Sequence, residues 1–392
     1  MSIFLIGMDQ TAGAIHFSDR IAWIWRSAAY HNLLLIAMIV AAILLIRYAA
    51  RREYWQNAAR QVRGRRLAMI SFVILWVYVW IGLLDSIRWG DPVSNPDGKL
   101  VRNEAGQLIY SPRRWSLLDR ICTPLREKTE KTYSAPLATH LYTKSTIQQP
   151  EGRVTREHPP LQHPRSHLFG TDKVGTDVFY RALKGIRTAL IIGGFTTLTA
   201  IPFALCFGVL AGYFGGRIDD IVQYIYSTLA SIPSILLIAA FMLLFGHGLF
   251  NLCLILGISS WTGLCRLLRG ETLKLRELEY IQAAEAFGVS RWKILAKHIV
   301  PNVMHIVLIS AILRFSGLVF FEALLTYLQI GVDPTTGSWG NMINTARLEL
   351  ARDPVVWWNL IAAFLFMFGL VLPANLFGDA VRDALDPRLR TE

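Results

Sequence analysis

Charged residues are scarce in this chain. Of its 392 residues, only 17% are Asp, Glu, Lys or Arg, whereas 53% are hydrophobic. Soluble domains usually carry about 25% charged residues, so the composition argues against a soluble protein. Charge is missing altogether from residues 188–216, 221–265 and 355–378. A helix needs only about 20 apolar residues to cross a bilayer. The chain is therefore expected to be an integral membrane protein.

Sequence motifs for catalysis and metal binding are also missing. The four cysteines have no paired spacing, which argues against a disulfide framework or a metal site. The only Gly-Lys pair, Gly98-Lys99, is followed by Leu100, and no glycine stands at position 93, so it is not a phosphate loop. Neither His-Glu-x-x-His nor Gly-x-Ser-x-Gly occurs. We therefore expect no catalytic residues, no metal site and no ATPase site in this chain.

The net charge of +12 invites a nucleic-acid interpretation. The basic residues, however, cluster in short segments beside apolar runs, where they set the orientation of a membrane protein. No nucleic-acid recognition module accompanies them. We expect membrane lipid, and no nucleic acid, as a partner.

Apolar segments predict an all-α bundle with about six or seven membrane-spanning helices. The segments are residues 30–46, 67–87, 188–213, 221–245, 249–265, 301–325 and 355–377. The strip from 47 to 66 between the first two holds seven arginines against one acid. Such a short basic loop stays in the cytoplasm. Alternation from there places residues 266–300 and the C-terminus on the cytoplasmic side too.

The same pattern suggests four regions. Residues 1–87 hold the first two candidate spans and the basic loop, and residues 88–185 form a polar extracytoplasmic insert with a histidine- and proline-rich stretch. We expect the histidines there to be solvated loop residues rather than metal ligands. Residues 186–380 form the main transmembrane domain, including a loop at 270–300, and residues 381–392 form a cytoplasmic tail. The first apolar segment could alternatively be a signal peptide or lie in the membrane interface, although the arginines after it resist translocation.

The loop at 270–300 holds the most informative pattern. One helical face can hold Leu278, Ile281, Ala284 and Phe287, while charged residues keep the segment exposed to solvent. Gly288 can adopt positive φ and so end one short helix and turn the chain into the next. Pro301 suits the start of the following membrane helix. An amphipathic helix lying on the membrane surface is the simpler alternative.

This loop resembles the cytoplasmic coupling loop of ABC importer permeases. The family signature is Glu-Ala-Ala, three residues, Gly, nine residues, Ile, one residue, Leu-Pro. Gln282-Ala283-Ala284, Gly288, His298, Val300 and Pro301 fall in register with it, with Gln, His and Val in place of Glu, Ile and Leu.

Further family-like segments extend the resemblance from about residue 163 to residue 390, and the chain is similar to the second permease subunit of dipeptide/oligopeptide (and nickel) importers. These segments are Leu168–Asp172, Gly175–Asp177, Ala211–Gly216, Ile232–Ser234, Gly337–Met342, Gly378-Asp379 and Arg382–Pro387. The first apolar span and the insert lie outside the usual pattern.

The resemblance implies a type I ABC importer permease fold in the bacterial inner membrane and a role in moving peptides or similar solutes. It implies three kinds of partner: a related permease subunit forming a heterodimer, two cytoplasmic ATPase subunits, and an extracytoplasmic solute-binding protein. No cofactor is then bound by this chain, because ATP is used by the partners. The ATPase-coupling residues implied are Glu279, Tyr280, Gln282, Ala283, Ala284, Phe287, Gly288, Arg291 and Pro301.

Two charged residues fall inside the apolar span 301–325. Arg314 and Glu322 are eight residues apart, about 12 Å along a helix, so they cannot pair directly. An ionised side chain inside a membrane is costly unless it is paired or hydrated. Each is expected to face a water-filled translocation pathway or a partner subunit, with structural pairing to a neighbouring helix as the alternative.

Gly208, Gly212 and Gly216 recur every four residues, a spacing that lets membrane helices approach closely. We expect them to serve packing.

Two other functions remain open from the sequence. An ion-gradient-driven secondary transporter would use Glu322 but leave the Ala-Ala/Gly loop unexplained. A membrane-anchored assembly protein would act through residues 88–185.

Overall fold

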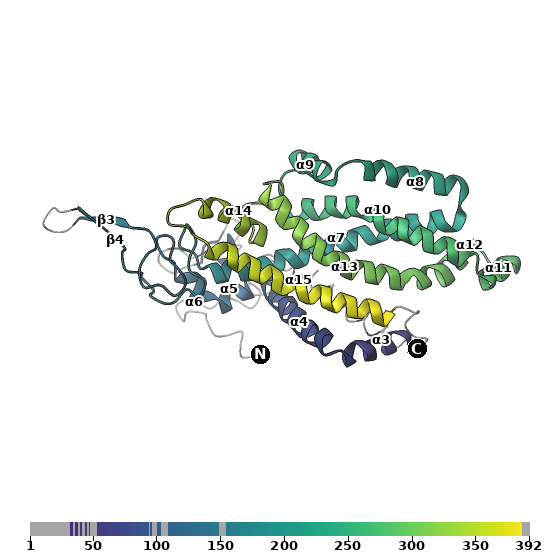
Figure 1. Ribbon diagram of the computed structural model, residues 1–392, viewed down its shortest axis with the longest axis horizontal. Helices are drawn as coiled ribbons and strands as arrows, with labels where there is room; N and C mark the ends of the chain where they lie inside the picture. The colour runs from purple at the N-terminus through teal and green to yellow at the C-terminus, as the bar shows by residue number, and fades with distance from the viewer. Residues whose placement is uncertain are drawn as a thin grey trace.

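Helices dominate the computed structural model, which describes residues 53–93, 95, 100–102, 109–148 and 154–385, with isolated helical positions between 32 and 47. The long helices run side by side in one elongated bundle (Figure 1). Loops, short helices and strands gather at one end of the bundle. Two short helices within residues 279–294 project at the other end. The all-α prediction is confirmed.

Five helices in the described part of the chain are long and apolar enough to cross a membrane. They are α4 (Arg66–Ser86), α7 (Val178–Phe214), α10 (Leu249–Arg276), α13 (Val300–Tyr327), which extends back to Arg291, and α15 (Trp358–Leu385). These match five of the predicted apolar segments. The predicted span at 30–46 lies, apart from isolated positions, outside the described residues.

The predicted span at 221–245 is not one straight helix. It divides into α8 (Gly216–Ser231) and α9 (Ser234–Phe245), which meet at an angle of 84°. Pro233 explains the break, because it lacks an N–H and disfavours helical geometry in the residue before it. Ile232 accordingly has extended dihedral angles. The described residues thus provide up to six spans if the bent pair counts as one.

Close packing of α7 against α10 depends on two of the three spaced glycines. A Cβ added to Gly208 would lie 2.8 Å from the carbonyl oxygen of Cys265, and one added to Gly212 would lie 2.7 Å from that of Arg269. Both contacts are with backbone, so neither position has room for a side chain. Gly216 has nothing within 4 Å and begins α8 at a φ of +50°. The packing prediction therefore holds for the first two glycines and was wrong for the third.

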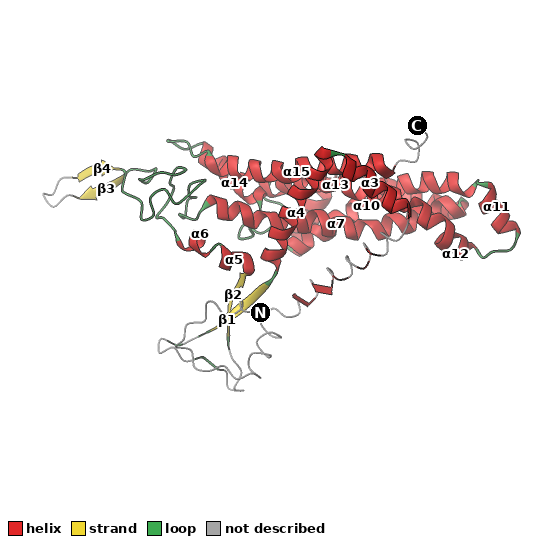
Figure 2. Cartoon of the chain, turned by 90° about the horizontal axis from the view of Figure 1, so that it is seen from below, coloured by secondary structure: helices red, strands yellow, loops and turns green. Residues whose placement is uncertain are grey.

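The predicted extracytoplasmic insert contains two antiparallel ribbons and two short helices. Strand β1 (Arg88–Pro92) pairs with β2 (Tyr110–Ser116), and β3 (Ser145–Gln148) pairs with β4 (Val154–Glu157). Helices α5 (Leu117–Ile121) and α6 (Thr123–Glu127) follow β2. Seen from below, the first ribbon projects sideways from the bundle beside α5 (Figure 2).

Helix α7 begins earlier than its apolar run suggests. The Asp177 carboxylate accepts the N–H of Tyr180 and caps the helix at Val178, eight residues before the predicted boundary at 186. His167 lies beside the same cap, buried, with its Nδ1 2.9 Å from Asp177. The polar first turns are helical because a capped N-terminus and tertiary packing outweigh their low hydropathy.

The histidine- and proline-rich stretch is packed rather than loose. The buried Glu130 carboxylate accepts the backbone N–H groups of Gln162 and His163, at 3.0 and 2.8 Å. His158 lies 2.9 Å from the carbonyl oxygen of Leu141 and is exposed, whereas the His163 side chain is half-buried. The expectation of solvated histidines therefore holds for His158 and only in part for His163. No group of three or more potential ligands that could hold a metal occurs among the described residues.

A buried polar cluster ties the insert to the bundle. Lys184 of α7 contacts both Asp85 at the end of α4 and Asp119 of α5, the latter at 2.8 Å. Arg187 pairs with Asp85 at 3.1 Å, and Ser116 and Asp119 form a capping box at the start of α5. Burial alone would raise the pKa of Asp119, but hydrogen bonds from Lys184, Ser116 and Tyr180 lower it to about 2. The carboxylate thus stays ionised and holds three segments together.

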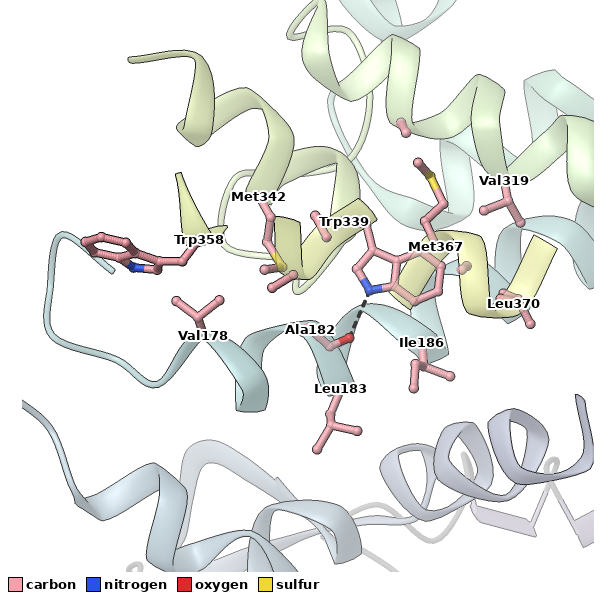
Figure 3. Packing of buried hydrophobic residues seen from close by; sticks show 14 of the residues in the cluster. Val178, Ala182, Leu183, Ile186, Val319, Trp339, Met342, Trp358, Met367 and Leu370 are labelled. Atoms are coloured by element: carbon pink, nitrogen blue, oxygen red, sulfur yellow. Dashed lines mark hydrogen bonds between the residues drawn. The ribbon is translucent and has the colours of Figure 1, made fainter. Parts of the chain in front are cut away.

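A hydrophobic core that includes Trp339 and Trp358 packs against the first turns of α7. Trp339, at the start of α14 (Trp339–Leu350), is buried against α7, and its Nε1 donates to the carbonyl of Ala182 at 2.9 Å (Figure 3). Trp358, at the start of α15, is equally buried and donates to the carbonyl of Thr171 at 2.9 Å. Both indoles satisfy their polar end while burying their rings, as buried tryptophans require.

The opposite end of the bundle carries the basic N-terminal helix and the C-terminus. Helix α3 (Glu53–Gly64) packs through Ala58 against Leu385 at the end of α15. Arg65 pairs with Asp383 at 2.6 Å. The basic strip and the end of α15 thus share one side, as the charge pattern predicted, and the loop at 270–300 lies at this same end (Figure 1).

Candidate functional site

A short helical hairpin projects from the end of the bundle that is remote from the β-ribbons (Figure 1). We call residues 278–302 the elbow. It consists of α11 (Glu279–Ala286), α12 (Arg291–Ile294) and the π-helical turn η2 (Leu295–Ile299). The sequence prediction of two short helices about a glycine is confirmed.

Gly288 makes the turn between the two helices. Its φ is +75°, a left-handed conformation that glycine adopts without a Cβ clash. The Gly288 N–H bonds the carbonyl of Glu285 at 3.0 Å, and the Val289 N–H bonds that of Ala284 at 3.1 Å. This pair of bonds is the Schellman motif, which satisfies the last carbonyls of a helix and reverses the chain. The elbow therefore has a defined shape.

Four aliphatic side chains fasten the elbow to the bundle. They join a buried cluster with residues of α7 and α10, and each is at most 5% exposed: Ile281, Ile294, Leu295 and Ile299. Burial of an aliphatic side chain stabilises by about 1.5–3 kcal/mol. The elbow is therefore packed firmly against α7 and α10.

The outward side of the elbow is apolar and aromatic. Phe287 is 88% exposed and Trp292 68% exposed, with Leu278 and Tyr280 also exposed. The expectation that Leu278, Ile281, Ala284 and Phe287 share one face was therefore wrong. Helix α11 has only eight residues, so Leu278 and Phe287 fall at its two caps and turn away from the Ile281 side.

The predicted coupling residues are brought together on this elbow, and nearly all are accessible. Ala284 is half-buried. The others are exposed: Glu279, Tyr280, Gln282, Ala283, Phe287, Gly288, Arg291 and Pro301. Arg291 lies 3.6 Å from Glu285, with both side chains exposed, so their attraction contributes little to stability. The surface is available to a partner.

The elbow leads into the membrane without a break. Helix α12, η2 and α13 form one helix from Arg291 to Tyr327. The Val300 N–H bonds the carbonyl of Leu295, five residues back, which makes the wide turn before Pro301. Pro301 stands in the first turn of α13 as predicted. A π-turn next to a proline absorbs the missing hydrogen bond and is a frequent place for a bend.

The two charged residues of α13 have different environments. Glu322 is 2% exposed, and Thr326 donates to its carboxylate at 2.9 Å. Gly340 of α14 makes room beside it, since a Cβ there would lie 3.1 Å from Glu322 Oε1. Arg314 is half-buried and donates to the carbonyl of Ser260 in α10 at 2.6 Å. Glu322 thus faces this chain's own packing, and its place in a pathway stays a prediction.

Sequence reasoning missed two contacts, one on the elbow and one between α8 and α10. The rings of Trp292 and Phe214 meet edge to face with centroids 5.8 Å apart. The guanidinium of Arg269 in α10 donates hydrogen bonds to both carboxylate oxygens of Asp219 in α8, at 2.5 and 2.6 Å. An aromatic between Arg291 and Lys293 was a usable signal for the first contact. The second joins positions 50 residues apart, which no local pattern reveals.

Comparison with known proteins agrees with this arrangement. Residues 204–391 match the family model described as "Binding-protein-dependent transport system inner membrane component". The dipeptide transport system permease protein DppC of Bacillus subtilis (strain 168) is 34% identical over 224 residues, covering 57% of this chain and 69% of that protein. The glutathione transport system permease protein GsiD of Pectobacterium atrosepticum is 36% identical over 226 residues, covering 58% and 74%. The oligopeptide transport system permease protein OppC of Escherichia coli (strain K12) is 33% identical over 224 residues, covering 57% and 73%.

A solved structure, the inward-facing methionine ABC transporter MetNI, is similar over 53% of this chain and 97% of its own, at 18% identity with a TM-score of 0.43. The sequence relatives are decisive, because identity above 30% extends over more than two thirds of their length. The matched region contains α10, the elbow, α13 and α15. The chain therefore belongs to the family of multi-pass inner-membrane permeases of binding-protein-dependent transport systems.

Proposed function

We propose that this chain is the membrane subunit of an ABC importer that carries peptides inward with ATP hydrolysed by separate subunits. The exposed face of the elbow carries the proposal. Phe287 and Trp292 present aromatic surface on a scaffold fastened by Ile281, Ile294 and Ile299. Aromatic side chains of this kind anchor protein–protein interfaces. A cytoplasmic ATPase that grips this face could drive the bundle.

The partners proposed are a related permease subunit, two ATPase subunits and an extracytoplasmic binding protein. The family description names a binding-protein-dependent system, and the sequence has no phosphate loop of its own. ATP would thus be bound by the partners and no cofactor by this chain. Bound ATP must favour one packing of the bundle over the other, because a ligand shifts an equilibrium only through differential affinity. Alternation between outward- and inward-facing packings follows.

Peptides are the proposed cargo, because the relatives are permeases of dipeptide, glutathione and oligopeptide systems. The test is uptake of labelled tripeptides into proteoliposomes that hold the assembled complex with its binding protein. Uptake should require ATP inside the liposomes and stop with vanadate. Uptake driven by an ion gradient without any ATPase would favour the secondary transporter. An absence of uptake under either driving force would favour an assembly role.

A variant of the elbow turn sharpens this test. Gly288→Val should weaken ATPase association and uptake together, because its left-handed φ suits glycine. Gly288→Asn is the matched control, since asparagine tolerates this conformation. Equal uptake by all three proteins would separate the elbow from energy coupling.

A further inference from the structure

Arg314 is a cation near the middle of a membrane-spanning helix with no acidic partner among the described residues. Its Nη1 donates to a neutral group, the Ser260 carbonyl, at 2.6 Å. Two other cations on the long helices have acidic partners: Lys184 pairs with Asp119, and Arg269 pairs with Asp219. A guanidinium carries several N–H groups and cannot be deprotonated. No carboxylate of the described residues therefore neutralises this charge.

Helix α10 is shaped to receive this guanidinium. A Cβ added to Gly263 would lie 2.8 Å from Arg314 Nη2, so the glycine leaves space that any side chain would fill. Ser260, one turn earlier, supplies the carbonyl that holds the other nitrogen. Gly263 is exposed and Arg314 half-buried. The charged group thus lies at the surface of the bundle between α10 and α13.

The depth of Arg314 matters for what can reach it. It is the fifteenth of the 28 residues of α13, so about 20 Å of helix separates it from either end. A cation facing lipid at this depth would be costly, and such residues face a water-filled cavity or a partner. A half-buried cation at this depth is therefore expected to face a water-filled route or a partner subunit.

We propose that Arg314 binds the carboxylate of the transported solute, the C-terminal carboxylate of a peptide, as it passes between α10, α13 and the neighbouring subunit. The assignment rests on the proposed peptide function. A planar guanidinium fits a carboxylate with two parallel hydrogen bonds. Every unblocked peptide carries this group whatever its side chains, so one cation serves cargo of varied sequence. Glu322, enclosed against Thr326, takes no part in this contact.

The experiment compares trialanine with trialanine amide in the reconstituted complex. Arg314→Gln should lower trialanine uptake by about 10-fold or more, the size expected for a charge-assisted pair, and leave amide uptake unchanged. The ratio between the two substrates then approaches one. Arg314→Lys should keep part of the preference, and Gly263→Ala should reduce it by displacing the guanidinium.

Arg266→Gln is the matched control. This neighbouring cation of α10 lies over the Tyr226 ring, 5.0 Å from its centroid, and its loss should leave the substrate ratio at the wild-type value. Basal ATPase activity, measured without peptide, reports on assembly. An Arg314→Gln complex that transports both substrates at wild-type rates overturns the proposal.

Equal loss of both substrates with intact ATPase activity also overturns it, and indicates pairing of Arg314 with an acidic residue of the neighbouring subunit. Failure of the wild-type complex to take up either substrate with ATP would instead contradict the proposed peptide function.

Discussion

Ile281 and Phe287 lie six residues apart on the elbow and face opposite ways: Ile281 is fully buried and Phe287 is 88% exposed. One holds the elbow to the bundle, and the other offers surface to a partner. Stability and partner binding are therefore separable on a single short hairpin.

Phe287→Ala and Ile281→Ala should affect different properties, the first ATPase binding and the second stability. Phe287→Ala should leave the thermal stability of the purified chain unchanged within about 0.5 kcal/mol and weaken ATPase binding by about 2 kcal/mol if Phe287 anchors the interface. Ile281→Ala should lower stability by about 2–5 kcal/mol through the cavity it leaves. Thermal unfolding in detergent and co-purification of the ATPase give the two readouts. Unimpaired ATPase binding by Phe287→Ala would remove this residue from the interface.

Glycine substitutions in α7 should separate packing from helix propensity. Gly212→Ala should destabilise by about 1–3 kcal/mol, because its Cβ would lie 2.7 Å from the Arg269 carbonyl of α10. Gly194→Ala is the control in the same helix: nothing lies within 4 Å of its Cβ, and alanine favours a helix by up to about 1 kcal/mol. Thermal unfolding measures both. Equal stability of the two variants would argue against tight α7–α10 contact.

The ionisation of Asp119 should make the free energy of unfolding depend on pH. Its pKa is lowered to about 2 from a usual 3.8, so the unfolded chain takes up a proton before the folded one does. The stabilisation, roughly 2 kcal/mol, is fully present above about pH 4 and is lost as the pH falls toward 2. The difference in unfolding temperature between wild type and Asp119→Asn should shrink over that window. Glu127→Gln, at a 65% exposed side chain, should show no such trend.

Labelling can test the orientation of the bundle. Cysteines at Asn57 and Glu285, both exposed at the elbow end, should react with a membrane-impermeant maleimide only after permeabilisation. A cysteine at Val174, which is 63% exposed and lies four residues before α7 in the predicted extracytoplasmic insert, should react in intact cells. The background protein carries Cys206→Ser, because this native thiol is exposed. Labelling of Glu285→Cys in intact cells would invert the topology and contradict the proposed coupling to cytoplasmic ATPases.

Local patterns predicted five of the spans, the glycine turn at Gly288 and the place of Pro301, because each depends on residues close together in the chain. The outward exposure of Phe287 was not predicted. Helix α11 has only eight residues, so helical periodicity does not determine which way its capping residues face. Pro233 explains why the helix breaks between α8 and α9. The angle of 84° between these two helices depends on packing against other helices. The contact of Arg314 with Ser260 joins positions 54 residues apart, so only the fold brings them together.

The continuous helix from Arg291 to Tyr327 joins the elbow to Arg314, with the π-helical turn and Pro301 between them. From Trp292 to Arg314 is 22 residues, about 33 Å of rise, so tilting the helix by about 5° displaces the guanidinium by roughly 3 Å. That distance is enough to open a hydrogen-bonded pair. Under the assignments proposed above, a movement that a nucleotide-driven motor imposes on the elbow would loosen the binding of an anionic cargo along one continuous helix.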